Sequence, residues 1–238
     1  PMNSETCSGD AAAPRLGHGE VAVLLSGGLD SAILTARLLE QGERVHPIYI
    51  RCGLRWEQAE QAAIRRYLRA LDSPNLAELT RFELPLSDLY GNHWSVTGDS
   101  VPHAASPDEA VFLPGRNALL VIKAIVWCQL RNIGRLALAP LGTSPFADAS
   151  LDYLQQLGRV LSSGGSAHVA IECPFARFDK PAVMRLGAAL PLEHTFSCID
   201  PIRRLHCGRC NKCHERRQAF EAVGRQDPTR YALAAGSA

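Results

Sequence analysis

The chain has 238 residues, of which 46% are hydrophobic and 21% are charged, and its formal net charge at pH 7 is +1. This composition is typical of one sizeable globular protein, and the near-neutral charge does not favour nucleic acid as a partner. No apolar run approaches the ~20 residues that a helix needs to span a bilayer, which argues against a membrane protein.

Residues 1–20 are mostly small and polar and lack the charged and apolar regions of a signal peptide. We expect a flexible lead-in there, then a nucleotide-binding α/β domain over residues 21–196 and a zinc-binding region over residues 197–238. The chain contains eight cysteines but is too long for a small disulfide scaffold. We therefore expect a cytoplasmic protein with reduced thiols.

A six-residue string, Ser-Gly-Gly-Leu-Asp-Ser, lies between an apolar run at residues 21–25 and a helical pattern at residues 32–41. A buried strand, a glycine turn and a helix start together form an anion site, because the first N–H groups of the helix are free to bind. The residues of this string that we expect to form a nucleotide site are Ser26, Gly27, Gly28, Leu29, Asp30 and Ser31.

Two side chains of the string carry additional chemistry. Asp30 and Ser31 provide a carboxylate and a hydroxyl that suit Mg²⁺ and a phosphate oxygen. No Gly-Lys-Ser/Thr follows, so the string is not a Walker loop. The alternative is an ordinary strand-to-helix turn in which Asp30 and Ser31 only cap the helix.

The remainder of the chain alternates between strand and helix patterns. We expect strands at 45–50, within 78–84, at 135–139 and at 167–171, and helices at 56–71, 117–132, 151–161 and 180–189. Alternating strands and helices form a parallel sheet, so the predicted fold class is α/β. Ligands of such sheets bind beyond the carboxyl ends of the strands, where the glycine-rich string lies.

Residues 85–114 show no clear periodicity, and such a segment is often a lid or a substrate-binding loop. It ends in a Pro-Gly turn at Gly115, followed by Arg116 and by Asn117 as a predicted helix cap. Arg116 can form paired hydrogen bonds with a phosphate or a carboxylate, and we name it as a catalytic candidate. A solvated arginine on a surface turn is the alternative.

Two later segments also supply candidate residues. In residues 142–148, Asp148 can accept hydrogen bonds from an amine or a guanidine-like edge of a substrate, with Phe146 stacked beside it. A turn that ends in a helix cap would explain Asp148 equally well. Lys180 stands at a helix start, where the helix dipole disfavours a cation, so we expect a compensating anion such as a polyphosphate. A surface lysine is the alternative.

The end of the second strand is expected to border an adenine. Ile50 is therefore a predicted ATP contact, together with Gly115 and Gly142 in turns on the predicted ligand side. Arg55 is a candidate substrate contact. The alternative is that Arg55 and Glu57 are only ion-pair partners.

Four cysteines near the C-terminus have the spacing of metal ligands. Cys207, Cys210 and Cys213 follow one another at intervals of three, and Cys198 lies upstream. Four thiolates suit a tetrahedral structural Zn²⁺ site, and an iron–sulfur cluster is the second possibility. The basic residues around them are either a solvated face or a contact for a polyanion. These are Arg203, Arg204, Arg209, Lys212, Arg216 and Arg217.

Taken together, these motifs resemble the 7-cyano-7-deazaguanine synthase family. The resemblance runs from about Val21 to Tyr231 and rests on the combination of SGGLDS, FLPGRN, the Lys-Pro helix start and the cysteine set. It implies a Rossmann-like adenine-nucleotide α-hydrolase fold with a small C-terminal zinc-binding region. It also implies conversion of 7-carboxy-7-deazaguanine, ammonia and ATP to a nitrile in queuosine-type biosynthesis.

The resemblance further implies Mg²⁺ and Zn²⁺ as cofactors and a homodimer. The SGGLDS residues would hold the ATP phosphates, with Arg116 and Lys180 near the polyphosphate or the substrate. The chain departs from the family pattern on the substrate side: Ser144–Ser150 keeps an acidic residue but lacks the usual Tyr and Cys, and Gly53–Glu57 differs from the usual Gln-Arg-His. A relative that adenylates another carboxylate, stops at an amide or modifies a tRNA or protein amine is the alternative, and a nucleotide-binding module without catalysis is a third.

Overall fold

The computed structural model describes residues 19–165 and 167–233, so most of the expected N-terminal lead-in lies outside the described residues. Its centre is a five-stranded sheet in the order β3-β2-β1-β4-β5, with every neighbouring pair parallel. This confirms the predicted α/β class. The strands are β1 (Glu20–Leu24), β2 (Arg44–Arg51), β3 (Thr80–Glu83), β4 (Arg135–Ala137) and β5 (Ala170–Glu172).

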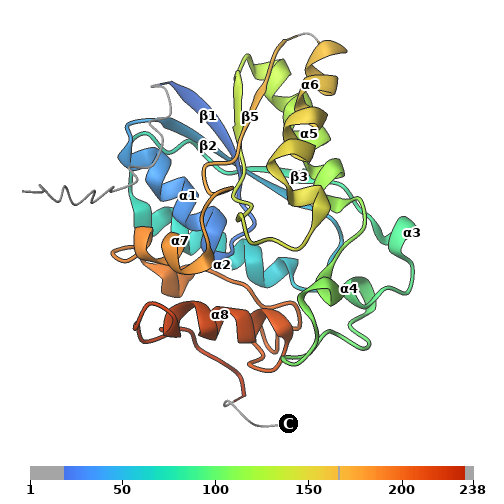
Figure 1. The fold of residues 1–238 in the computed structure, drawn as a ribbon, viewed down its shortest axis with the longest axis vertical. Coiled ribbons are helices and arrows are strands. Elements are labelled where there is room, and N and C mark those ends of the chain that lie inside the picture. The colour runs from blue at the N-terminus through green and yellow to red at the C-terminus, as the bar shows by residue number, and fades with distance from the viewer. Residues whose placement is uncertain (1–18, 166, 234–238) are drawn as a thin grey trace, which may run out of the picture.

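Helices cover both faces of the sheet. Figure 1 shows α1 and α7 on one side of the strands and α5 and α6 on the other, with α8 across the end of the molecule below α7. The longer helices are α1 (Leu29–Glu40), α2 (Glu57–Leu71), α5 (Arg116–Arg131), α6 (Leu151–Ser163), α7 (Lys180–Leu186) and α8 (Asn211–Glu221). Among the described residues, no helix combines the length and apolar character that crossing a membrane requires.

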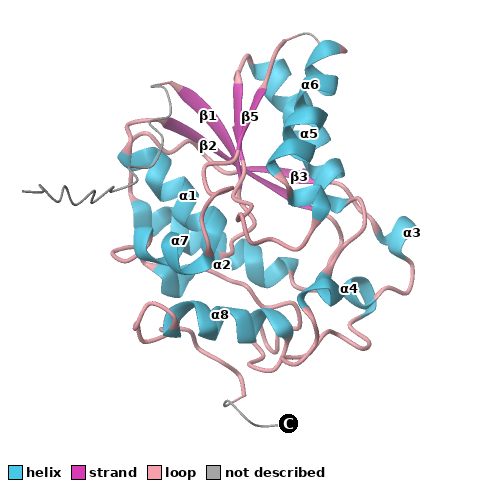
Figure 2. Ribbon diagram, viewed as in Figure 1, coloured by secondary structure: helices cyan, strands magenta, loops and turns pink. Residues whose placement is uncertain are grey.

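The segment expected to be irregular, residues 85–114, contains only short helical pieces joined by loops (Figure 2). Its elements are α3 (Ser87–Tyr90), α4 (Trp94–Thr97) and a 3₁₀ turn at Asp108–Val111. Two further 3₁₀ turns lie at Ala147–Ala149 and Leu192–His194.

The central strand is buried on both faces, as parallel sheets require. Val21 and Val23 of β1 pack in the cluster that includes α1 and α7, whereas Ala22 between them packs in the cluster on the α5 and α6 side. All three side chains have no exposed surface. This alternation makes β1 a rigid base for the loop that follows it.

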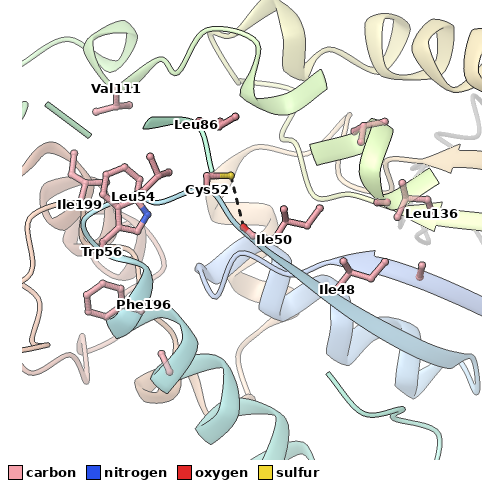
Figure 3. Packing of buried hydrophobic residues seen from close by; sticks show 14 of the residues in the cluster. Ile48, Ile50, Cys52, Leu54, Trp56, Leu86, Val111, Leu136, Phe196 and Ile199 are labelled. Atoms are coloured by element: carbon pink, nitrogen blue, oxygen red, sulfur yellow. Dashed lines mark hydrogen bonds between the residues drawn. The ribbon is translucent and has the colours of Figure 1, made fainter. Parts of the chain in front are cut away.

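The apolar core continues beyond the carboxyl end of β2. Figure 3 shows Ile48 and Ile50 of the strand in line with Trp56 at the start of α2, with Phe196 and Ile199 of the C-terminal part beside it. The C-terminal region therefore shares this core with the strand ends, where a ligand is expected.

Helix α7 and strand β5 are both shorter than the sequence pattern predicts. Helix α7 ends at Leu186 because Gly187 follows it in close contact with α1. A Cβ at Gly187 would lie 2.7 Å from Ile33. Strand β5 begins at Ala170, because the backbone N–H of Val169 donates to Ser162 Oγ instead of to a strand.

Candidate active site

The loop of residues 26–31 is held by hydrogen bonds within itself. Ser31 Oγ lies 3.0 Å from Ser26 Oγ, accepts the N–H of Ser26 at 3.2 Å and contacts the carbonyl oxygen of Gly28 at 3.4 Å. Gly27 has a φ of +81°, and an added Cβ would lie 3.0 Å from Ile64, so the turn requires glycine. Ser31 therefore shapes the loop with its side chain.

The N-terminus of α1 is open. Gly28 is its N-cap residue, and no side chain caps the free N–H groups. The alternative in which Asp30 and Ser31 only cap this helix is wrong, because both lie inside the helix and neither forms a capping bond. Free N–H groups at the end of a parallel strand are the arrangement that binds phosphates.

Asp30 is paired with a lysine from the other half of the chain. Lys180 Nζ, at the start of α7, lies 2.7 Å from Asp30 Oδ2 and 3.3 Å from Glu215 of α8. Lys212 of α8 lies 2.5 Å from the other oxygen of Glu215. Burial disfavours the charge of Lys180, but Asp30 and Glu215 more than offset this effect and raise the pKa of Lys180. The expected anion beside Lys180 thus includes two carboxylates of the protein.

Of three cavities that Asp30 lines, two also have Arg116 in their walls. The strand-end cavity, of about 380 Å³, lies beyond β1, β2 and β4, whose order in the sheet makes β1 and β4 the topological switch point. Its walls include Ile50, as predicted for the adenine side, and Leu138 and Pro140 after β4. The second, which we term the aromatic cavity, has about 270 Å³ and shares Ser26, Gly28, Asp30, Arg116, Asn117 and Phe146 with the first.

Five rings line the aromatic cavity, and two pairs of them stack. The rings of Trp56 and Trp94 are 5.8 Å apart with a 23° tilt, and those of Phe112 and Phe146 are 5.5 Å apart with a 21° tilt. Phe196 is the fifth. Parallel aromatic pairs of this kind suit a flat heterocycle. Trp94 and Phe112 come from residues 85–114, which therefore supply part of the cavity wall.

Arg116 and Asn117, at the start of α5, face the cavities. Asn117 is not the helix cap predicted from the sequence; Gly115 is the N-cap residue, with a φ of +72°, and the Asn117 amide instead donates to Asp148 Oδ1 at 3.0 Å. Asp148 does not cap α6 either, because Ser150 does so. The buried atoms without a hydrogen-bond partner in the described chain include three from predicted site residues, Arg116 Nε, Asp148 Oδ2 and Asp30 Oδ1.

A further carboxyl group on the wall of the aromatic cavity has no counterpart in the sequence prediction. Glu60 of α2 is 8% exposed, and the Tyr49 hydroxyl donates to its Oε2 at 2.7 Å. Burial raises the pKa of Glu60 to about 7, although Arg116 and the bond from Tyr49 favour the ionised form.

Several of the predicted site residues line neither cavity, and Asp148 is one of them, because it reaches the cavity walls only through its bond from Asn117. Arg55 is not part of either cavity wall; its guanidinium lies 3.4 Å from Asp200, which agrees with the ion-pair alternative. Gly142 is in close contact with Ala176, whose carbonyl oxygen would be 2.8 Å from an added Cβ. Gly115 acts as the left-handed turn before α5.

The four predicted cysteines come together. All are buried, and their Sγ atoms lie within 4.8 Å of one another, with Cys207 and Cys213 at 3.9 Å and Cys198 and Cys210 at 3.8 Å. Tetrahedral Zn–S bonds of about 2.3 Å require S···S distances of about 3.8 Å. Backbone N–H groups of Cys207 and Gly208 point at the sulfurs of Cys198 and Cys213, at 3.2 and 3.4 Å, and so favour thiolates.

The basic cluster is divided between buried and exposed residues. Arg216 is 1% exposed and donates to Thr195 Oγ1 and to the carbonyl oxygen of Leu192, both at 2.9 Å. Burial lowers its pKa. A solvated face therefore does not describe Arg216. The sequence around Arg216 does not predict this buried, hydrogen-bonded position. It arises from the packing of α8 on the segment that contains Leu192 and Thr195.

A family model described as queuosine biosynthesis protein QueC matches residues 20–224, which is most of the chain. The chain belongs to the QueC family. A 7-cyano-7-deazaguanine synthase of Anaeromyxobacter dehalogenans is 32% identical over 225 residues, covering 88% of this chain and 94% of that protein. The enzyme of the same name from Methanothermobacter thermautotrophicus is 29% identical over 221 residues, covering 87% and 97%. The family predicted from the motifs is confirmed.

One solved structure extends the likeness to the fold. A 4-thiouridine synthetase in complex with RNA and bound ATP has a TM-score of 0.50 and 16% identity, covering 87% of this chain and 50% of that chain. At that identity the likeness concerns the fold alone, and it agrees with the parallel sheet that carries the SGGLDS loop in this QueC-family protein.

Proposed function

We propose that this protein activates the carboxylate of a 7-carboxy-7-deazaguanine-type substrate with ATP and converts it with ammonia to the nitrile. The observation that carries the proposal is the position of Asp30 and Lys180, 2.7 Å apart where the open N-terminus of α1 meets both cavities. Relatives with the name 7-cyano-7-deazaguanine synthase over most of the chain support the substrate class.

The two cavities fit the two substrates. Adenosine occupies the strand-end cavity against Ile50, with its phosphates toward the N–H groups of α1. The flat deazaguanine lies between the ring pairs of the aromatic cavity, where Asn117, whose amide donates to Asp148, offers its carbonyl oxygen to the amino edge. In the proposed arrangement the substrate carboxylate points toward Arg116, and the presence of Arg116 in both cavity walls supports this.

The chemistry requires two activations. A carboxylate oxygen attacks the α-phosphorus of ATP, pyrophosphate leaves, and ammonia displaces AMP from the acyl-adenylate to give an amide. Adenylation of the amide oxygen and loss of AMP then give the nitrile. Lys180, Arg116 and the α1 N–H groups stabilise the charge that develops on the phosphates, and catalysis of this kind rests on preorganised donors.

The residues fit both expected metals. Asp30 Oδ1 is a buried carboxylate oxygen without a partner in the described chain, and this is the type of ligand that Mg²⁺ prefers. Bound there, Mg²⁺ would neutralise the departing pyrophosphate. The four buried thiols would hold Zn²⁺ in a closed, structural site, since no position is left for water.

Two accompanying expectations belong to this proposal. The cytoplasmic location agrees with reduced thiols and with ATP and ammonium as substrates. The homodimer is supported by an apolar stripe on α5, where Ile122, Val126 and Leu130 are 36%, 47% and 75% exposed. These residues are spaced by four and so lie on one helix face. A V126R variant that remains dimeric by light scattering would contradict this interface.

The adenylation step can be tested separately. The protein should exchange labelled pyrophosphate into ATP only when 7-carboxy-7-deazaguanine is present. Exchange that requires another carboxylate instead would retain the adenylating reaction and reject the substrate. No exchange with any carboxylate would reject the proposed reaction.

A further inference from the structure

One carboxyl group in the aromatic cavity has no role in the adenylation described above. The carboxyl groups that line this cavity belong to Asp30, Glu60 and Glu215. Asp30 and Glu215 form ion pairs with lysines. Within the described part of the chain, Glu60 forms no ion pair at 4.0 Å or less, and its carboxyl is held by the Tyr49 hydroxyl.

The surroundings of Glu60 suit a small cation. Trp56 and Trp94, which are stacked on each other, line the same cavity, and indole faces attract cations. Burial strengthens the interaction of a carboxylate with a cation that reaches it, because the local dielectric is low. The other charged or titratable groups that act on Glu60 are Tyr49 from β2, Arg116 from α5 and Glu57 from its own helix.

Ammonia reaches an enzyme at neutral pH mainly as ammonium, which has no lone pair for attack. The proposed reaction therefore needs a group that binds this cation and removes a proton. Resting on the proposed function, we infer that Glu60 binds the ammonium ion in the aromatic cavity and accepts the proton that it must lose before attack.

The Glu60 carboxylate takes a proton from ammonium, and the freed lone pair forms the C–N bond at the acyl-adenylate carbonyl. The carbon–oxygen bond to AMP breaks, and AMP leaves with the bonding electron pair. The proton on Glu60 and the second proton lost by the nitrogen pass to solvent. A pKa of about 7 lets this carboxyl be ionised when ammonium binds and still hold the proton afterwards.

A substitution of nearly equal shape tests the inference. The E60Q variant keeps the size of the side chain and loses the charge. It should raise the KM for ammonium or lower the ammonium-dependent rate by about 10-fold or more. Pyrophosphate exchange precedes nitrogen attack, so E60Q should lower the exchange rate far less than the ammonium-dependent rate.

Hydroxylamine provides a second readout, since it is uncharged at neutral pH and attacks acyl-adenylates without prior deprotonation. The rate of hydroxamate formation should therefore be similar in E60Q and the unaltered protein. The matched control is E57Q, which removes a buried carboxyl on the same helix. Glu57 binds the backbone N–H of Cys52 and lies 3.6 Å from Arg51, and neither cavity wall includes it. Because Glu57 raises the pKa of Glu60, folded E57Q should move the acidic limb to lower pH but keep the KM for ammonium above that limb.

The outcomes separate the two proposals. If E60Q loses pyrophosphate exchange and hydroxamate formation as much as ammonium use, Glu60 is a structural residue and the inference is overturned. If E60Q does not fold, Y49F replaces it. Loss of the hydroxyl should move the acidic limb of the ammonium-dependent rate to higher pH and leave the hydroxamate profile in place, and an unmoved limb would overturn the inference. Absence of exchange in the unaltered protein would instead reject the proposed function.

Discussion

Lys180 Nζ lies 2.7 Å from Asp30 Oδ2, although the two residues are separated by 150 positions in the chain. The pair joins the start of α7 to the loop after β1, and through Glu215 it reaches α8 as well. The backbone supports the same closure, because the N–H of Phe196 donates to the carbonyl oxygen of Gly27 at 2.7 Å. The C-terminal region thus packs directly on the loop that is proposed to bind the phosphates.

Replacement of the lysine tests this closure. K180A should lower pyrophosphate exchange by about 100-fold or more, close to 2.7 kcal/mol, because a preorganised cation beside the phosphates is lost. The matched control is K123A, since Lys123 donates to a backbone carbonyl oxygen of β3 and neither cavity wall includes it. Equal exchange rates in K180A and K123A would refute a role of Lys180 in adenylation.

The cysteine cluster should be structural. C210S is expected to release Zn²⁺ and to lower the free energy of unfolding by about 3 kcal/mol or more, because metal binding at such sites is folding energy. Metal content by mass spectrometry and urea unfolding measure both effects. C173S, a substitution outside the cluster, should retain the metal and change stability by about 1 kcal/mol or less. Unchanged metal content in C210S would disprove the assignment.

The lowered pKa of Glu215 should make the stability of the protein depend on pH. Burial opposes its ionisation, but Lys180 and Lys212 outweigh burial and lower its pKa from 4.5 to about 2. Between these values the unfolded chain binds more protons, so the stabilisation is present above about pH 4.5 and is lost as the pH falls toward 2. E215Q should lose about 1–2 kcal/mol at pH 7, a figure reduced for the screening of a side chain one-third exposed.

The control for this prediction is E193Q, which removes a carboxylate that is 48% exposed and lies 4.0 Å from His194. Urea unfolding at pH 7 and at pH 3 should show the gap between the unaltered protein and E215Q shrink in acid. A gap of equal size at both values would mean that Glu215 acts through packing rather than charge.

Asp148 should affect the deazaguanine and not the nucleotide. Its Oδ1 accepts the Asn117 amide and so orients Asn117 on the wall of the aromatic cavity, although Asp148 itself lines neither cavity. D148N should raise the KM of the carboxylate substrate by about 10- to 100-fold with the KM of ATP unchanged. D152N, on the exposed start of α6, should match the unaltered protein. A rise in both KM values of D148N would contradict the assignment.

Much of the fold and one side of the site could be predicted from the sequence. The SGGLDS string, the strand-to-helix alternation and the cysteine spacing all depend on neighbours in the chain, and local patterns record such neighbours well. Helix α8 could not be recognised, because its buried residues include Asn211 and Arg216 rather than an apolar stripe. These polar side chains can be buried because they form tertiary hydrogen bonds, and a local sequence pattern does not predict such bonds.

The substrate side was harder to predict for the same reason. Glu60 stands in an amphipathic helix where a glutamate normally faces solvent, and only the packing of α2 on β2 turns it toward Tyr49. Trp94 lies in a segment without periodicity, and its stacking on Trp56 depends on the path of that segment. Arg55 is the opposite case. Its position after the second strand favoured a substrate contact, but in the structure its partner is Asp200.

The most direct test of the account is product analysis with ATP, isotopically labelled ammonium and 7-carboxy-7-deazaguanine. The account predicts 7-cyano-7-deazaguanine with the label in the nitrile nitrogen, together with AMP and pyrophosphate. Release of ADP and phosphate, or a labelled amide that the protein does not convert further, would contradict it.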